Sequence, residues 1–134
     1  MPTVYASIWL IPDDDKYLAK RTGCEMSTQT SMIFGQNKPD AGIQTNLFTV
    51  SSLHQAQVSI FVANQGEEYD RFTIALVPNS VSVQPENYLA YNTPLIGNGV
   101  IAFSGIYINE GDQVLVSSTE GNCSFTATGM DFGP

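Results

Sequence analysis

One histidine and two nearby serines are the residues of this chain whose types could do chemistry. His54 follows Ser51 and Ser52, and a serine hydrolase needs a serine nucleophile activated by a base, usually histidine. Closeness in sequence says little about closeness in space, so these residues do not by themselves make a triad. We interpret His54 as a polar turn residue between two strands. We therefore expect no catalytic residue and no enzymatic activity.

Metal binding is the second chemistry to consider. The run Asp13–Asp15 could hold a hard cation such as calcium, but it neither alternates its ligands nor adds the later glutamate of an EF-hand. The segments Glu110–Asp112 and Glu120–Asn122 also lack the EF-hand ligand pattern, so we interpret them as acidic hairpin turns and not as calcium sites. Zinc needs a cluster of His or Cys ligands, and the two cysteines, Cys24 and Cys123, lie far apart in the chain. We expect no metal and no cofactor.

Three aromatic residues leave an alternative open. Trp9, Tyr88 and Tyr91 could form a sugar-stacking platform, as in carbohydrate-binding modules. Packing in the core or burial in a subunit interface would account for the same residues. Solvent exposure of the three rings separates these interpretations.

Charge excludes one class of partner. The 134 residues carry 13 Asp and Glu against 5 Lys and Arg, a formal net charge of −8, and no cation follows Arg71. Nucleic-acid binding depends on clustered cations, so we expect no nucleic-acid partner.

No run approaches the roughly 20 apolar residues of a membrane helix. Because no signal peptide is visible, we expect assembly in a reducing cytoplasm and two free thiols, Cys24 and Cys123.

The elements that would position these residues are strands. Alternation of apolar and polar residues over Ala56–Ala63, and apolar runs between Gly, Asn and Pro turns elsewhere, indicate about nine short strands and little helix. We predict an all-β fold, an antiparallel β-sandwich of jelly-roll or immunoglobulin-like type. We expect a single domain over residues 1–134, with an N-terminal arm and the first strands in 1–46 and the sandwich core in 47–134. The strands are expected at Val4–Ile11, Ser31–Phe34, Leu47–Ser51, Ala56–Ala63, Arg71–Val77, around Tyr88 and Leu89, and at Val100–Phe103, Ile106–Ile108, Gln113–Ser117 and Cys123–Thr128.

The same alternation predicts the core. Ala75 and Val77 fall on the opposite face of their strand from the core residues, so both faces of that strand are expected to be covered. The predicted core residues are Val58, Ile60, Val62, Phe72, Ile74, Leu76, Val114, Val116, Cys123 and Phe125.

From Leu47 onward, a set of turn and strand residues falls in a fixed order: Asn64, Gly66, Pro78, Tyr88, Tyr91, Pro94, Ile96, Asn98, Gly99, Val100, Gly105, Ile106, Gly111, Asp112, Ser124 and Phe125. In this order the chain resembles small β-sandwich virion proteins of tailed bacteriophages, particularly those of cyanobacteria and other aquatic bacteria. Their usual pattern is a strand ending in N-x-G, a strand ending near Pro, a Y-x-x-Y-x-x-P-I-P-x-N-G-V segment, a Gly-Ile strand, a G-D turn and a final V-S-F strand.

The resemblance implies a virion structural protein without catalytic residues. Its expected role is a head decoration or cement protein that bridges major capsid subunits. A tail, baseplate or fibre accessory protein is the alternative, and a carbohydrate-binding module is a further one. The expected partners are the major capsid protein or other virion proteins, and copies of this chain in a homo-oligomer. The expected location is the virion.

An apolar N-terminal run suggests how the protein attaches. A small domain would not leave such a run exposed, and a buried Trp is a common interface anchor. Like-charged sandwiches should also repel one another, so we expect association through this run, by apolar contact or strand addition, rather than through the sandwich faces. The candidate interface residues are Val4, Tyr5, Ile8, Trp9 and Leu10.

Overall fold

The computed structural model describes residues 28–133, which form eight strands and one short 3-10 turn. The strands and the turn, in chain order, are β1 (Thr28–Asn37), β2 (Thr45–Thr49), β3 (Gln55–Asn64), β4 (Asp70–Val77), η1 (Pro85–Asn87), β5 (Tyr88–Leu95), β6 (Val100–Asn109), β7 (Gln113–Ser118) and β8 (Cys123–Gly133).

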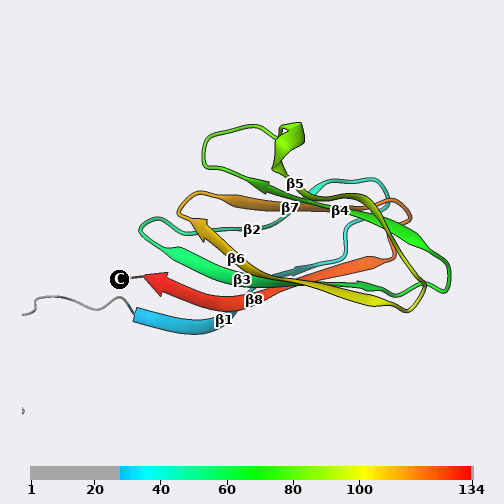
Figure 1. The fold of residues 1–134 in the computed structure, drawn as a ribbon, viewed down its shortest axis with the longest axis horizontal. Helices are drawn as coiled ribbons and strands as arrows, with labels where there is room; N and C mark the ends of the chain where they lie inside the picture. The colour runs from blue at the N-terminus through cyan, green and yellow to red at the C-terminus, as the bar shows by residue number, and fades with distance from the viewer. Residues whose placement is uncertain (1–27, 134) are drawn as a thin grey trace, which may run out of the picture.

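The strands pair as if one long hairpin had been folded in half and rolled up. β1 pairs with β8, β2 with β7, β3 with β6 and β4 with β5, all antiparallel. Rolling then places β3 beside β8 and β4 beside β7. Two stacked sheets result, β1-β8-β3-β6 and β2-β7-β4-β5 (Figure 1). Eight strands in this order make a jelly roll. The predicted all-β sandwich is confirmed, and the jelly roll is the correct one of its two forms.

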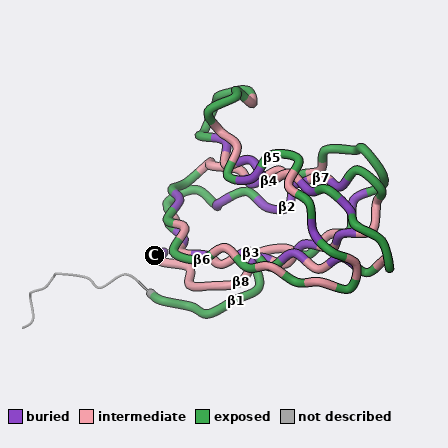
Figure 2. The backbone as a smooth tube through the Cα atoms, turned by 45° about the vertical axis from the view of Figure 1, so that its right-hand side comes forward, coloured by how far each residue is buried: buried purple, intermediate pink, exposed green. Residues whose placement is uncertain are grey.

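The core fills the space between the two sheets, where the buried parts of the strands face one another (Figure 2). Phe72 of β4 packs edge-on against Phe125 of β8, with ring centroids 6.4 Å apart, which joins the layers at the centre. Nine of the ten predicted core residues are buried, and Leu76 is half-buried against them. Ala75 and Val77 are also buried, so the prediction that both faces of β4 are covered is confirmed.

Several predicted strand boundaries are wrong. The runs Val100–Phe103 and Ile106–Ile108 are one strand, β6, which continues through a bulge opposite β3. Gly105 adopts φ +74° inside it, a left-handed conformation that glycine accepts readily, so the glycine bends the strand and does not end it. The first and last described strands, β1 and β8, also run several residues further than predicted.

Every outer strand of both sheets carries an irregularity in its pairing. The register shifts at one or two points in each of the four pairs that include an edge strand, whereas the central pairs β3–β8 and β4–β7 keep an unbroken register. Bulges on edge strands disfavour pairing with the edge of another sheet. Contacts through a sheet face are therefore favoured over extended edge-to-edge pairing.

Some predictions concern residues outside the described part of the chain. These are the strand at Val4–Ile11, the state of Cys24, and the candidate interface residues Val4, Tyr5, Ile8, Trp9 and Leu10. Within residues 28–133, no helix is both long enough and apolar enough to span a bilayer.

Candidate functional site

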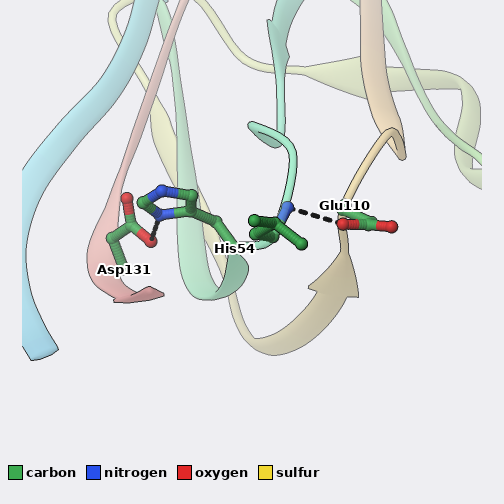
Figure 3. Close-up of polar contacts among 4 residues, drawn as sticks. His54, Glu110 and Asp131 are labelled. Atoms are coloured by element: carbon green, nitrogen blue, oxygen red, sulfur yellow. Dashed lines mark hydrogen bonds and ion pairs between the residues drawn. The ribbon is translucent and has the colours of Figure 1, made fainter. Parts of the chain in front are cut away.

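His54 lies in the loop between β2 and β3, as the sequence predicted, and faces Asp131 of β8 (Figure 3). Its Nδ1 lies 2.7 Å from Oδ1 of Asp131, and both side chains are mostly buried. The backbone N–H of His54 donates to the carbonyl of Ser51. Within residues 28–133, no serine hydroxyl is hydrogen-bonded to the imidazole. The contact between His54 and Asp131 therefore links the β2–β3 loop to the last strand, β8.

Asp70, the first residue of β4, organises the opposite end of the sandwich. It is 1% exposed, and its carboxylate accepts four hydrogen bonds. Oδ2 accepts from the Ser118 hydroxyl at 2.6 Å and from the Asn122 N–H at 3.0 Å. Oδ1 accepts from the Glu120 N–H at 2.9 Å and the Arg71 N–H at 2.7 Å. The carboxylate thus fixes the tight turn between β7 and β8.

The surroundings of Asp70 set its protonation state. Burial raises the pKa of its carboxyl group, but the hydrogen bonds from Ser118, Glu120, Asn122 and Arg71 favour the charged form and leave the pKa below its ordinary value of 3.8. Asp70 is therefore ionised at neutral pH. All four bonds lie within the fold, so we assign this carboxylate to stability.

Cys123 is a free, buried thiol at the start of β8, which confirms the prediction for this cysteine. Burial and, to a lesser extent, the nearby charge of Asp70 together raise its pKa to about 11. We therefore predict that Ellman's reagent modifies Cys123 at least a hundredfold more slowly in the native protein than in denaturant. Rapid modification of the native Cys24→Ser variant, in which Cys123 is the remaining thiol, would contradict this.

Charge is concentrated at the two ends of the sandwich. Within residues 28–133, every charged side chain lies in a loop or at the end of a strand. One end carries Lys38, Asp40, Glu67, Glu68, Asp70, Arg71 and Glu120, and the other carries Glu86, Glu110, Asp112 and Asp131. In this part of the chain the negative charge therefore lies at the ends of the sandwich and not on its faces, and the expected repulsion between like-charged sandwiches stays a prediction.

The outer side of the β1-β8-β3-β6 sheet is wholly uncharged, and we call it the neutral face. Asp131 is the one charged residue in these four strands, and it pairs in register with buried Ala56 and so points inward. By register and burial the neutral face comprises Gln29, Ser31, Ile33 and Gln36 of β1, Ser124, Thr126, Thr128, Met130 and Phe132 of β8, Gln55, Gln57, Ser59, Phe61 and Ala63 of β3, and Val100, Ala102, Tyr107 and Asn109 of β6.

The neutral face shares two features with the core of a protein interface, the absence of charge and the presence of large apolar side chains. Its large apolar side chains include Ile33, Phe61, Val100 and Tyr107, all of which are exposed. Interface cores are depleted in charge and enriched in aromatic residues and Met. Ten-residue strands at the usual spacing give this four-stranded face roughly 30 Å by 19 Å. That is about 600 Å² before side-chain relief, close to the ~800 Å² that each partner buries in a standard interface.

A hollow of about 330 Å³ lies at one end of the neutral face. The side chains of Gln55, Tyr107, Asn109 and Phe132 line it. Amide groups and aromatic rings therefore surround a recess that a protruding side chain of a partner could fill. Tyr107 is 72% exposed, so its ring is free to make such a contact.

Two of the three residues considered for a sugar platform lie together. The rings of Tyr88 and Tyr91 are in contact on β5, with centroids 4.8 Å apart and planes inclined by 64°. Tyr91 is 69% exposed and Tyr88 is half-buried. Trp9 lies outside the described residues. Core packing is therefore the wrong interpretation for Tyr91.

Comparison with known proteins adds no identification. No family model, curated protein or solved structure matches this chain. Among residues 28–133, no three His, Cys, Asp or Glu side chains converge as a metal site would require. The surfaces of the molecule and the resemblance of its sequence are therefore what points to its function.

Sequence reasoning missed the neutral face, although part of its signal was present. The segments that became β1, β3 and β6 contain no charged residue, which is readable before folding. The outward residues of β1, β8, β3 and β6 share one surface because of the order of these strands in the sheet. The turn pattern in the sequence does not specify that order.

Proposed function

We propose that this chain is a virion structural protein of a tailed bacteriophage, most specifically a head decoration or cement protein that bridges major capsid subunits. The observation that carries the proposal is the neutral face, a large uncharged surface on a protein of net charge −8. Such a face can be desolvated against a partner without burying an unpaired charge, which would be costly.

The resemblance to phage virion proteins supports the same proposal, and its motif residues have clear structural roles. Asn64 is buried and donates its side-chain N–H to the carbonyls of Glu68 and Leu95. Asp112 accepts the N–H groups of Asn79 and Asn109. These residues close the loops at the two ends of the sandwich. The motif therefore supports a shared fold directly and a shared role by analogy.

A decoration protein presents surfaces to its neighbours and carries out no reaction, and a rigid sandwich suits that role. The bulged edges disfavour open-ended pairing of sheets, while the second sheet packs against the inner side of the sheet that carries the neutral face. Charges at the ends keep free copies soluble. The N-terminal run Val4–Leu10 would supply a second contact with the capsid or with sister subunits.

The alternative within the same class is a tail, baseplate or fibre accessory protein. Both roles place the chain in purified particles, and copy number separates them. Quantitative mass spectrometry of particles should find hundreds of copies for a decoration protein and few for a tail component. Absence of the chain from purified particles would refute both.

The docking role of the neutral face makes a mutational prediction. Tyr107→Glu places a charge in the hollow at one end of the neutral face, where a docked partner would desolvate it. We expect apparent affinity for particles lacking the protein to fall at least about tenfold, measured as occupancy against added protein. Circular dichroism should show an unchanged fold, because Tyr107 points into solvent.

A matched control is available in Tyr69→Glu. Tyr69 is 65% exposed, similar to Tyr107, but it lies in the β3–β4 loop among the acidic residues of one end. We expect this variant to bind particles like the wild type. Equal occupancy for Tyr107→Glu and wild type would remove the neutral face as the docking surface, and equal losses in both variants would indicate a non-specific effect of charge.

A further inference from the structure

The arrangement of Tyr88 and Tyr91 is built by an irregular strand. Residues three apart point to opposite sides of a regular strand. Here the pairing of β5 with β4 shifts register twice, around Ile74, and the two rings meet on one side. Bulges re-aim side chains in this way, often next to binding sites.

Neighbouring side chains hold the irregular segment in place. Asn92 adopts φ +50°, an uncommon conformation for a residue with a side chain. Its N–H donates to the Thr73 hydroxyl at 3.0 Å, and its carbonyl accepts from the Arg71 guanidinium at 3.1 Å. The position of Tyr91 is thus fixed by its neighbours before any ligand arrives.

A groove of about 560 Å³ runs beside the two rings. It is lined by Val83, Gln84, Pro85, Tyr88 and Tyr91, and none of these side chains is charged. The turn η1 forms its other wall and is braced by a hydrogen bond from the Gln84 N–H to Asn87 Oδ1 at 2.7 Å. We call this feature the tyrosine groove.

We propose that the tyrosine groove binds a neutral hexopyranose unit of an oligosaccharide. A pyranose ring has an apolar face that stacks on an aromatic ring, and the exposed ring of Tyr91 offers a rigid surface of that kind. The tyrosine hydroxyls and the Gln84 carboxamide can donate to and accept from sugar hydroxyls. The uncharged lining matches an uncharged ligand, and the volume lies within the range of small-ligand sites.

The geometry favours a sugar over a proline-rich peptide. Polyproline helices dock into aromatic-lined grooves that accept the proline rings. The rings of Tyr88 and Tyr91 are in contact, with their centroids 4.8 Å apart. No space therefore remains between the two rings for a proline. What they present is one flat ring supported by the edge of the other, which is the shape of a stacking platform.

The groove lies on the layer opposite the neutral face. β5 belongs to the β2-β7-β4-β5 sheet, and η1 rises above that sheet, away from β1, β8, β3 and β6 (Figure 1). A subunit that docked through its neutral face would leave the groove open to solvent. The sugar site does not depend on the virion assignment, since it can be tested on the isolated protein.

The test is isothermal titration of the full chain with maltotetraose, cellotetraose and chitotetraose, with decaproline as the competing ligand class. We expect at least one oligosaccharide to bind, decaproline not to bind, and Tyr91→Ala to weaken the sugar affinity about tenfold or more. Tyr91→Phe should retain most of the affinity, because it keeps the ring. Binding of none of the three sugars at 10 mM, or binding of decaproline alone, would overturn the proposal.

Tyr69→Ala is the matched control because it removes a tyrosine of similar exposure, 65% against 69%, that does not line the groove. It should bind sugar like the wild type. A loss equal to that of Tyr91→Ala would show that the effect is not specific to the groove. Tyr91→Ala should also occupy particles normally, which separates the sugar site from the docking role.

Discussion

Alanine in place of Asp70 should lower the free energy of unfolding by about 3 kcal/mol, the largest stability loss predicted here for a polar residue. The substitution leaves the N–H groups of Glu120 and Asn122 and the hydroxyl of Ser118 without their shared acceptor. Each buried donor without a partner costs about 1–3 kcal/mol, and partial entry of water into the β7–β8 turn limits the sum. Urea denaturation followed by circular dichroism measures the change.

Asp70 also predicts how stability depends on pH. Because its folded pKa lies below the ordinary value of 3.8, the unfolded state takes up a proton before the folded state does as the pH falls. The stabilisation is therefore complete above about pH 5 and is lost as the pH falls from there through the folded pKa. Asp70→Asn should lose this part of the pH dependence, because its side chain does not titrate.

Asp40→Asn is the control, since Asp40 is an exposed carboxylate in the β1–β2 loop at the same end. It should change stability by less than about 0.5 kcal/mol and retain the acid-dependent loss. An Asp70→Asn variant as stable as the wild type, with the same pH profile, would show that the carboxylate does not hold the turn.

The fold was predictable from the sequence to the extent that local pattern determines it. Alternation in β3 and β4 identified the core correctly, because one face of each strand must be buried in a two-layer fold. The continuity of β6 was missed because Ser104 and Gly105 separate its two apolar runs, although glycine also permits a bulge within one strand. The Asp70 cluster could not be predicted, since its partners from Ser118 to Asn122 lie about 50 residues away in sequence.

The two candidate surfaces differ in how much the sequence reveals of them. Tyr88 and Tyr91 were singled out by type, but their spacing argues against a shared surface until the irregular pairing with β4 is known. The neutral face depends on the order of four strands that are not consecutive in the chain. Composition showed the net charge of −8 but not its concentration at the ends. Topology thus supplies what local pattern leaves open.

The second large effect is expected at Trp9, whose replacement by alanine should weaken binding to particles about 30-fold. This corresponds to about 2 kcal/mol, the usual loss at an interface hot spot. Trp9 lies in the apolar run Val4–Leu10, and residues 11–27 join that run to β1 at Thr28. A fully extended segment of seventeen residues spans at most about 60 Å. The segment 11–27 is therefore long enough to let the apolar run contact a neighbouring capsid subunit.

The chain offers its own reporter for this test, because Trp9 is its single tryptophan. Burial of Trp9 on the particle should shift its fluorescence emission to shorter wavelength when wild-type protein is added to particles lacking it. Trp9→Phe should retain most of the occupancy and Trp9→Ala should lose it, while circular dichroism shows both variants folded. Equal occupancy for Trp9→Ala and wild type would refute attachment through this run. Unfolding of Trp9→Ala would instead assign Trp9 to the folded core, leaving the neutral face as the remaining docking surface.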